Sequence, residues 1–339
     1  MKLAVTKYIA FVGFIALSFG VFGQQEAQFS HITNNPYLLN PAAGGTANVF
    51  NIEMVSRMQW AGYQGGPRTM MLAGYSPIKI GKSAKREAFN ESDDLLFQSP
   101  EVSLGEVKHI VGGRASLESI GVFNQTNLYG TYAIHIPFSK KLNMGVGLGV
   151  GWSNFGILED RVVLFEADDA SYEQFLGGTS AQNIFDANAG LTLYGENFFF
   201  GASTTQLLKN KVQFSDVLTT SNYNRHYFFI GSYTIAAGEK IGIEPNAVIK
   251  LAENSPFSGD FGVRLRYNRS SWLGVQYRTN NAVIFQLGTN LVKNIYVSYA
   301  YEHSVGAIRT AGHGTHEIQL GFYLGKNRKA DKDADDAAK

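Results

Sequence analysis

Few side chains in this sequence have the types and spacing that metal binding or catalysis requires. His303, His313 and His316 lie close together near the C-terminus, and Asp168 and Asp169 are adjacent in an earlier segment. Both groups offer metal ligands, but neither has the spacing of a zinc or calcium motif, so we expect solvated loops and no metal site. No nucleophile, base and orienting residue can be assembled either. The sequence therefore predicts a protein that is not an enzyme and holds no cofactor.

The glycines between Leu142 and Trp152 could at first suggest a phosphate-binding loop. They fall at alternate positions, large apolar residues fill most of the positions between them, and no helical pattern follows. This alternation indicates a β-strand with one face toward lipid and a second face on which the glycines leave space inside the protein. Segments of about ten alternating residues, repeated between turns, are typical of a transmembrane β-barrel.

Two arginines indicate what the second face meets. Arg264 and Arg266 alternate with Val263, Leu265 and Tyr267. An arginine facing lipid at the bilayer midplane costs about 2–4 kcal/mol, so both side chains are expected to face an aqueous lumen. The chain is therefore predicted to be all-β, a transmembrane antiparallel β-barrel of the outer-membrane type with about 14 strands. These strands are expected near residues 48–60, 68–78, 108–118, 123–137, 141–155, 184–194, 198–206, 225–237, 241–251, 258–267, 271–278, 281–291, 295–304 and 316–324.

The N-terminus predicts export. Lys2 and Lys7 precede an apolar stretch from Tyr8 to Phe22, which indicates a signal peptide cleaved after Gly23. The stretch is too short for a comfortable membrane-spanning helix. We therefore expect a signal peptide at 1–23, a periplasmic or plug segment at 24–47, the barrel at 48–324 and a polar, disordered periplasmic tail at 325–339.

The links between predicted strands alternate in length. The short ones are 139–140, 195–197, 238–240, 268–270 and 293–294, and the long ones include 156–183, 207–224 and 305–315. Outer-membrane barrels have short periplasmic turns and longer outer loops, so this pattern predicts an even strand number with both termini in the periplasm. Two links depart from it: 79–107 is long on the inner side, and 279–280 is short on the outer side.

Composition agrees with an exported barrel. The chain has 37 glycines, 17 tyrosines and 24 phenylalanines, as expected for a wet interior and aromatic girdles. It has no cysteine, hence no disulfide framework and no lipid-anchor cysteine. Loss of the signal peptide would remove two of 29 basic residues against 28 acidic ones, which leaves a nearly neutral chain with no indication of nucleic-acid binding.

Three blocks carry a family resemblance: residues 40–45 (Asn-Pro-Ala-Ala-Gly-Gly), residues 57–69 across the first hairpin, and residues 304–306 with 316–320 around the last strand. With Gln28-Phe29-Ser30, they resemble the PorP/SprF family of Bacteroidetes outer-membrane proteins, associated with type IX secretion and gliding motility. The insertion 81–105, the pair 118–119 and the polar tail depart from the family pattern. The family-motif residues are Asn40, Pro41, Gly44, His316 and Glu317.

The resemblance implies a non-enzymatic barrel that helps to secrete a particular cargo, or to hold it at the surface, through the cargo's C-terminal domain. The implied partners are an adhesin-like secreted surface protein with such a domain, other type IX components in the periplasm and outer-membrane lipid. Alternation alone also fits a second function, an outer-membrane channel or a transporter of hydrophobic substrates.

The first strand supplies candidates for the lumen. Its alternation assigns Ile52, Met54, Met58 and Trp60 to the lipid-facing row and Glu53, Arg57 and Gln59 to the inside. Charges in a narrow barrel need partners, so we expect a structural polar network rather than a binding site. The predicted members are Glu53, Arg57, Gln59, Glu244, Arg264 and Arg266.

The glycine-rich loop 61–67 could fold into the mouth or meet cargo, although it could equally be a tight hairpin that needs positive φ angles. The candidate cargo-contact residues in this loop and in the last outer loop are Trp60, Tyr63, Gly65, Pro67, Ile308 and His313.

Overall fold

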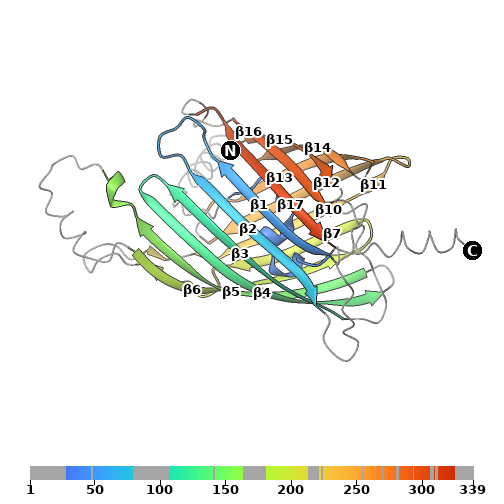
Figure 1. The fold of residues 1–339 in the computed structure, drawn as a ribbon, viewed down its shortest axis with the longest axis horizontal. Helices are drawn as coiled ribbons and strands as arrows, with labels where there is room; N and C mark the ends of the chain where they lie inside the picture. Colours follow the sequence, from blue (N-terminus) through green and yellow to red (C-terminus); the bar gives the residue numbers. More distant parts are fainter. Residues whose placement is uncertain are drawn as a thin grey trace, which may run out of the picture.

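Fourteen antiparallel strand segments close into a barrel, as the sequence predicted (Figure 1). The computed structural model describes residues 28–46, 49–78, 107–139, 142–162, 181–212, 221–222, 224–253, 255–268, 270–279, 282–292, 294–305, 309 and 312–324. The signal peptide, the tail and the insertion 81–105 lie outside these residues, as do Asp168, Asp169 and Ile308. No helix in the described part of the chain is long and apolar enough to cross a membrane.

The wall strands match the predicted positions to within a few residues. They are β1 (Phe50–Met58), β2 (Arg68–Ile78), β3 (Lys108–Ile120), β4 (Phe123–Ser139), β5 (Leu142–Ile157), β6 (Ala181–Tyr194), β7 (Phe198–Thr205), β10 (His226–Tyr233), β12 (Ile241–Ala252), β13 (Ser258–Tyr267), β14 (Ser271–Arg278), β15 (Ala282–Val292), β16 (Ile295–Ser304) and β17 (Thr315–Leu324). The short β11 (Ile235–Ala236) extends the line of β10 along β12, and β8 (Lys211–Val212) pairs with β9 (Ser221–Asn222) outside the wall.

The topology is a simple meander. Each wall strand pairs with its neighbours in sequence, and β1 pairs with β17 from Phe50 opposite Leu324 to Met58 opposite His316. This last pairing closes the barrel, so the wall has no exposed sheet edge at membrane depth, where unpaired backbone groups would be costly.

The two faces of the wall differ as alternation requires. Large apolar side chains such as Leu148, Val150 and Leu273 are exposed on the outside, while polar residues on alternate positions are buried inside. Arg264 is 1 % exposed and lies on the inner face. Trp60 departs from the expected lipid-facing row because β1 ends at Met58, which leaves Trp60 in the β1–β2 link with a φ of 52°.

The barrel has two distinct ends. We call the end with links 140–141, 195–197, 268–270 and 293–294 the turn end, and the opposite end, with links 59–67, 158–180, 206–225 and 305–314, the loop end. Because β1 begins and β17 ends at the turn end, Phe50 and Leu324 both lie there.

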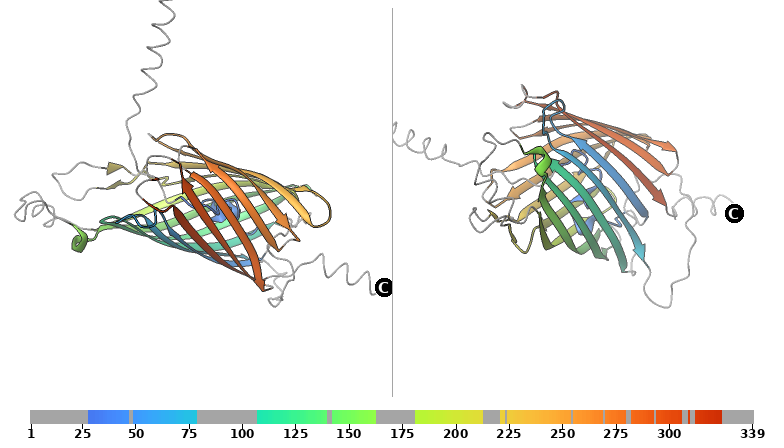
Figure 2. Two further views of the ribbon diagram at one scale, coloured as in Figure 1. Left: turned by 90° about the horizontal axis from the view of Figure 1, so that it is seen from above. Right: turned by 60° about the vertical axis from the view of Figure 1, so that its left-hand side comes forward.

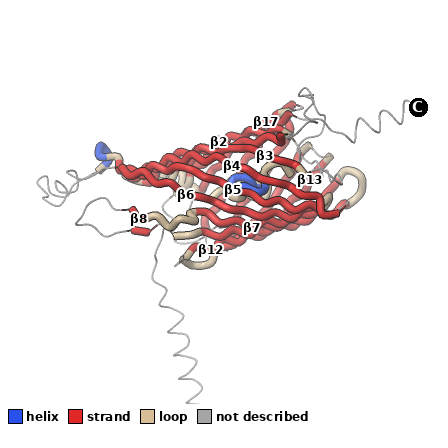
Figure 3. The backbone as a smooth tube through the Cα atoms, turned by 90° about the horizontal axis from the view of Figure 1, so that it is seen from below, coloured by secondary structure: helices blue, strands red, loops and turns tan. Residues whose placement is uncertain are grey.

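A segment before β1 fills the lumen, and we call residues 28–46 the plug. It contains two short 3-10 helices, η1 (Pro36–Leu38) and η2 (Pro41–Ala43), visible inside the ring of strands in Figures 2 and 3. A third, η3 (Glu159–Arg161), lies outside the barrel near the loop end. Phe29, Ile32, Tyr37, Leu38 and Leu39 are at most 2 % exposed. They pack against inward apolar residues of the wall, namely Val55, Met71, Ala73, Tyr75, Ile110, Ala133, Phe228, Ile230 and Val248.

The plug begins at the loop end, where Gln28 lies beside Ser255 and Pro256 of the β12–β13 link. The sequence predicted both termini at the turn end, and that expectation stays a prediction because the terminal residues lie outside the described residues. The short links fix only the strands, and they say nothing of the path that the chain takes before the first strand.

Candidate functional site

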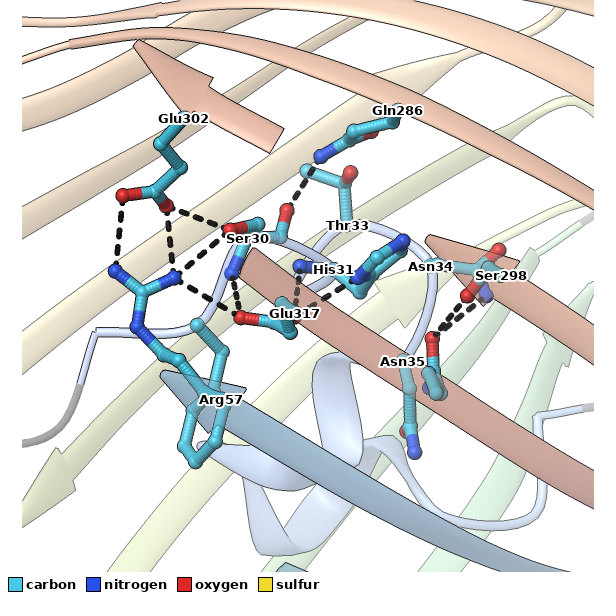
Figure 4. Close-up of polar contacts among 12 residues, drawn as sticks. Ser30, His31, Thr33, Asn34, Asn35, Arg57, Gln286, Ser298, Glu302 and Glu317 are labelled. Carbon is cyan, nitrogen blue, oxygen red and sulfur yellow. Dashed lines mark hydrogen bonds and ion pairs between the residues drawn. The ribbon is translucent and has the colours of Figure 1, made fainter. Parts of the chain in front are cut away.

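Arg57 is the centre of a polar cluster between the plug and the loop-end half of the wall (Figure 4). Both of its terminal nitrogens donate to Glu302 at 2.9 Å, and Nη1 also donates to Glu317 at 3.1 Å. All three side chains are at most 5 % exposed. Such an arrangement is stable only because each buried charge meets an opposite charge and hydrogen-bond partners.

Ion pairs continue from Glu302 around the wall. Arg278 Nη1 donates to Glu302 at 2.9 Å, Arg278 Nε donates to Asp260 at 2.8 Å, and Lys250 Nζ lies 2.8 Å from Asp260. The series joins five strands, β1, β16, β14, β13 and β12, and Glu317 adds β17. We call these residues the charge belt: Arg57, Glu302, Glu317, Arg278, Asp260 and Lys250. Its cations and anions balance, which suits burial in a narrow lumen.

The belt holds the first turn of the plug. Glu317 accepts from the backbone N–H groups of Ser30 (2.8 Å) and His31 (3.0 Å), and from the His31 ring at 2.8 Å. The Ser30 hydroxyl donates to Glu302 at 2.6 Å, and Gln286 donates to the Ser30 carbonyl. The family-motif residue Glu317 therefore joins the last strand to the plug through a carboxylate that receives several donors.

A second polar group lies nearer the turn end. Arg264 and Arg266 both pair with Glu244, and Arg264 also donates to the Thr33 carbonyl at 3.1 Å and to Asn34 at 3.0 Å. Since Glu244 and Arg264 are direct cross-strand partners, the ladder itself brings them together.

Glu53 lies in a separate group that binds the start of η1. It accepts from the side chains of Asn35, Asn51 and Gln319, with the last two at 2.8 and 2.6 Å. Asn35 also caps η1, since its side chain accepts from the backbone nitrogen of Tyr37 at 3.1 Å. Glu53 thus fixes the plug without an ion pair to Arg57.

The side of the plug opposite the charge belt packs against glycines of β5, β6 and β7. Asn40, Pro41 and Ala42 form the start of η2, and Asn40 donates to the Leu191 carbonyl at 3.0 Å. His135 and Thr192 both bond the Ala42 carbonyl, at 3.0 and 3.2 Å. A Cβ atom at Gly147, Gly190 or Gly201 would collide with this segment. Of the alternating glycines at 145–151, Gly147 therefore makes room for the Asn-Pro-Ala-Ala motif, whereas the other three make room for neighbouring residues of the wall.

Tyr37 and Gly44 also contribute to this contact between the plug and the wall. The Tyr37 hydroxyl is 2.6 Å from the Thr131 hydroxyl, and its ring meets Tyr75 edge-on at a centroid distance of 5.1 Å. Burial raises the pKa of Tyr37, against the lowering effects of the Thr131 hydrogen bond and of Arg114. A Cβ at Gly44 would lie 3.1 Å from the Tyr37 ring, so a larger residue would press on this contact.

The structure separates several of the residues that we expected to form one network. Arg57 belongs to the charge belt, and Glu244, Arg264 and Arg266 form the group at the turn end. Glu53 accepts hydrogen bonds from the uncharged side chains of Asn35, Asn51 and Gln319. Gln59 lies beyond the end of β1, where its backbone N–H donates to the Pro67 carbonyl at 2.8 Å. Sequence reasoning missed Lys250, Asp260, Arg278, Glu302 and the plug residues Ser30, His31 and Asn35, although alternation places the four wall residues on the inner face.

The loop-end candidates form an ordered surface. Ala61 N–H donates to the Gly314 carbonyl and His313 N–H donates to the Ala61 carbonyl, both at 2.7 Å. Gly121 N–H donates to the Gly65 carbonyl at 2.9 Å. Gly62 and Gly65 have φ angles of 87° and 76°, as the hairpin interpretation expects. We call this surface the platform: residues 60–67, Gly121 and residues 312–314.

Two platform side chains reach outward. Tyr63 is 49 % exposed, and its ring meets Trp60 edge-on at 6.5 Å. His313 is also exposed, with its ring close to Gly62. His316, which we expected near it, lies on β17 and bonds the Tyr299 hydroxyl at 2.6 Å. In the described part of the chain, no group of three His, Asp or Glu residues could hold a metal ion.

Cavities remain beside the plug in the described part of the chain, and we consider two of them. The larger, of about 330 Å³, opens at the turn end and is lined by residues that include Asn34, Glu53, Phe199, Arg266 and Tyr323. The smaller, of about 30 Å³, lies at the loop end and has Ile32, Leu39 and Phe228 in its lining.

The sequence model of one family, described as type IX secretion system membrane protein PorP/SprF, matches residues 21–322. The chain belongs to the PorP/SprF family. This PorP/SprF barrel is thus an outer-membrane β-barrel of the type IX secretion machinery, as its sequence blocks indicated. No match was found among curated proteins.

Solved structures similar to this PorP/SprF barrel are also outer-membrane barrels. The CymD monoaromatic hydrocarbon channel is 11 % identical, with a TM-score of 0.50 over 93 % of this chain and 97 % of its own. The toluene transporter TbuX of Ralstonia pickettii is 10 % identical, with a TM-score of 0.45 over 87 % and 94 %. Omp33 of Acinetobacter baumannii is 10 % identical, with a TM-score of 0.40 over 83 % and 100 %. At such identity, the likeness to CymD concerns the barrel fold alone.

Proposed function

We propose that this PorP/SprF barrel is a closed outer-membrane component that helps to secrete, or to hold at the cell surface, a specific exported protein through that protein's C-terminal domain. The observation that carries the proposal is the plug, whose charged and polar contacts join it to opposite sides of the wall. Because the plug occupies the lumen, the outer surfaces of the barrel remain available for contacts with other proteins.

The loop end is proposed to face the cell exterior. Its links 158–180, 206–225 and 305–314 are long, as extracellular loops of such barrels usually are. The platform lies at this end and offers the exposed Tyr63 beside Trp60 on a backbone fixed by three hydrogen bonds. Rigid aromatic side chains of this kind supply much of the binding energy in protein interfaces, which supports a cargo contact there. Partners among other periplasmic type IX components would meet the turn end.

Transport of a hydrophobic solute is the alternative. CymD is described as a monoaromatic hydrocarbon channel, and an apolar cavity at the loop end would favour a similar role here. The loop-end cavity beside the plug measures about 30 Å³, which is room for about two water molecules. Ligand pockets for small organic molecules usually exceed about 300 Å³, so the loop-end cavity is too small for such a ligand. The turn-end cavity of about 330 Å³ is large enough, but its lining includes the polar and charged residues Asn34, Glu53 and Arg266, which do not suit a hydrophobic solute.

Deletion of the gene should leave one surface protein in the periplasm or shed into the medium, while other secretion continues. A photo-crosslinker in place of Tyr63 should trap that same protein, because Tyr63 projects from the platform. The matched control is Tyr267, an aromatic residue that is 57 % exposed but lies at the turn end of β13. Altered uptake of a small solute with all surface proteins in place, and no crosslinked polypeptide, would favour the transporter.

The purified barrel should carry no steady ion current in a planar bilayer. The plug is bonded to β1, β13, β17 and β6, so no wide water path should remain through the lumen. An open porin inserted under the same conditions provides the positive control. Stable current steps from the unmodified protein would contradict the closed lumen and support a channel.

A further inference from the structure

The plug enters the lumen from the loop end. Gln28 lines the loop-end cavity with His226, the first residue of β10, and with Ser255, Pro256 and Ser258 around the β12–β13 link. The next carbonyl, that of Phe29, accepts from Arg278, which is the last residue of β14 and also lies at the loop end. Two independent contacts therefore place the start of the described chain at this mouth.

From there the plug descends toward the turn end. The Ser30 carbonyl accepts from Gln286, the Thr33 carbonyl accepts from Arg264, and Asn35 donates to Glu53. Arg278 pairs with Asp260 and Arg264 pairs with Gly274, so the partners of Phe29 and Thr33 lie four residues apart along β14. At about 3.4 Å per residue this is a descent of about 14 Å. The plug then reaches β1 at Phe50, at the turn end.

We infer that the chain threads its own barrel, so that the segment before Gln28 leaves at the loop end and the N-terminus lies opposite Leu324. If the loop end faces the exterior, as in the proposed function, the mature N-terminus is displayed at the cell surface. Cleavage after Gly23 would leave four residues before Gln28, which span at most about 14 Å. The apolar band of such barrels is about 25 Å tall, too far for these residues to return to the turn end.

A surface N-terminus adds a polar segment to the face that carries the platform. On this inference, Gln24, Gln25 and Glu26 would supply amide and carboxylate groups at the loop end. An exported polypeptide that approaches the loop end could then meet a free chain end of the barrel. A barrel with both termini in the periplasm could not offer this contact.

Single cysteines test the topology, because the native chain contains none. Gln28→Cys is compared with Asp160→Cys, an exposed position in η3 at the loop end, and with Glu239→Cys, an exposed position in the turn-end link 237–240. A membrane-impermeant maleimide is applied to intact cells and, separately, to permeabilised cells. A short epitope inserted after Gln25 gives a second measurement, and only barrels that migrate faster before boiling are scored.

Threading predicts that Gln28→Cys and the epitope behave like Asp160→Cys, with at least about a tenfold greater signal on intact cells than Glu239→Cys. The inference is overturned if Gln28→Cys and the epitope are labelled only after permeabilisation, as is expected for Glu239→Cys. If the orientation alone is wrong, Glu239→Cys is labelled on intact cells and Asp160→Cys is protected. Threading still requires Gln28→Cys and the epitope to be protected with Asp160→Cys in that case, so the two proposals fail separately.

Discussion

Replacement of Gly147 by valine should open the lumen to ions. A Cβ at this position lies 2.5 Å from the backbone nitrogen of Ala42 and 2.7 Å from its Cα. These are main-chain atoms of the plug, which cannot rotate away as a side chain can, and valine adds two further methyl groups. Overpacking of this kind costs about 1–3 kcal/mol, and displacement of η2 is the simplest way to relieve it. We expect steady current in planar bilayers and faster protease cleavage within residues 28–46.

The matched control is Gly130→Val on β4. A Cβ at Gly130 meets no atom within 4 Å, so this change adds the same atoms to the wall without touching the plug. Its barrel should stay closed and should unfold at the same temperature as the unmodified protein. A Gly147→Val barrel that remains fully assembled and electrically silent would show that the glycines do not make room for the plug.

The wall was predictable from the sequence because lipid imposes a strict rule on every strand. Each outward position must be apolar, and each backbone group must pair with a neighbouring strand, so alternation reveals the strands and short links reveal the turns. The glycines at 145–151 showed that the inner face of β5 needs room. They could not show that Gly147 faces the plug while the other glycines face wall residues, because the plug has no periodic pattern of its own.

The pairing of charges was less predictable. Glu53 and Arg57 share a face of β1, which suggested one network, but residues four apart on a strand are separated by about 14 Å. Cross-strand partners are much closer, and Arg57 lies directly opposite Glu317. Once the strand register is known, the partners follow: Glu244 faces Arg264, and Asp260 faces Arg278. The sequence alone gives the strands but not the register that decides these pairs.

The path of the plug was the least predictable feature. Its direction depends on contacts between Ser30, Thr33 and Asn35 and wall residues more than 200 positions later in the chain, except for Glu53. No local propensity indicates such contacts. The family motif at residues 40–45 did mark the segment, and the structure shows it packed on glycines of three strands.

Glu302→Gln should cause the largest loss of stability among conservative changes in the charge belt. Glu302 accepts from Arg57, Arg278 and the Ser30 hydroxyl, so the amide would leave two buried guanidinium groups with one negative partner fewer. Loss of one partner from a buried ion pair costs about 3–5 kcal/mol. We expect the urea midpoint for unfolding of the detergent-solubilised barrel to fall, with earlier protease cleavage of the plug.

An exposed ion pair supplies the control. Lys209 and Glu253 approach to 2.6 Å near the loop end, but their side chains are 44 % and 27 % exposed. Exposed pairs contribute at most about 1 kcal/mol, so Glu253→Gln should barely move the midpoint. A double change, Glu302→Gln with Arg57→Gln, removes one charge of each sign and should recover part of the loss. If Glu302→Gln shifts the midpoint no more than Glu253→Gln, the charge belt does not stabilise the plugged barrel, because a buried carboxylate with three donors cannot be removed at so small a cost.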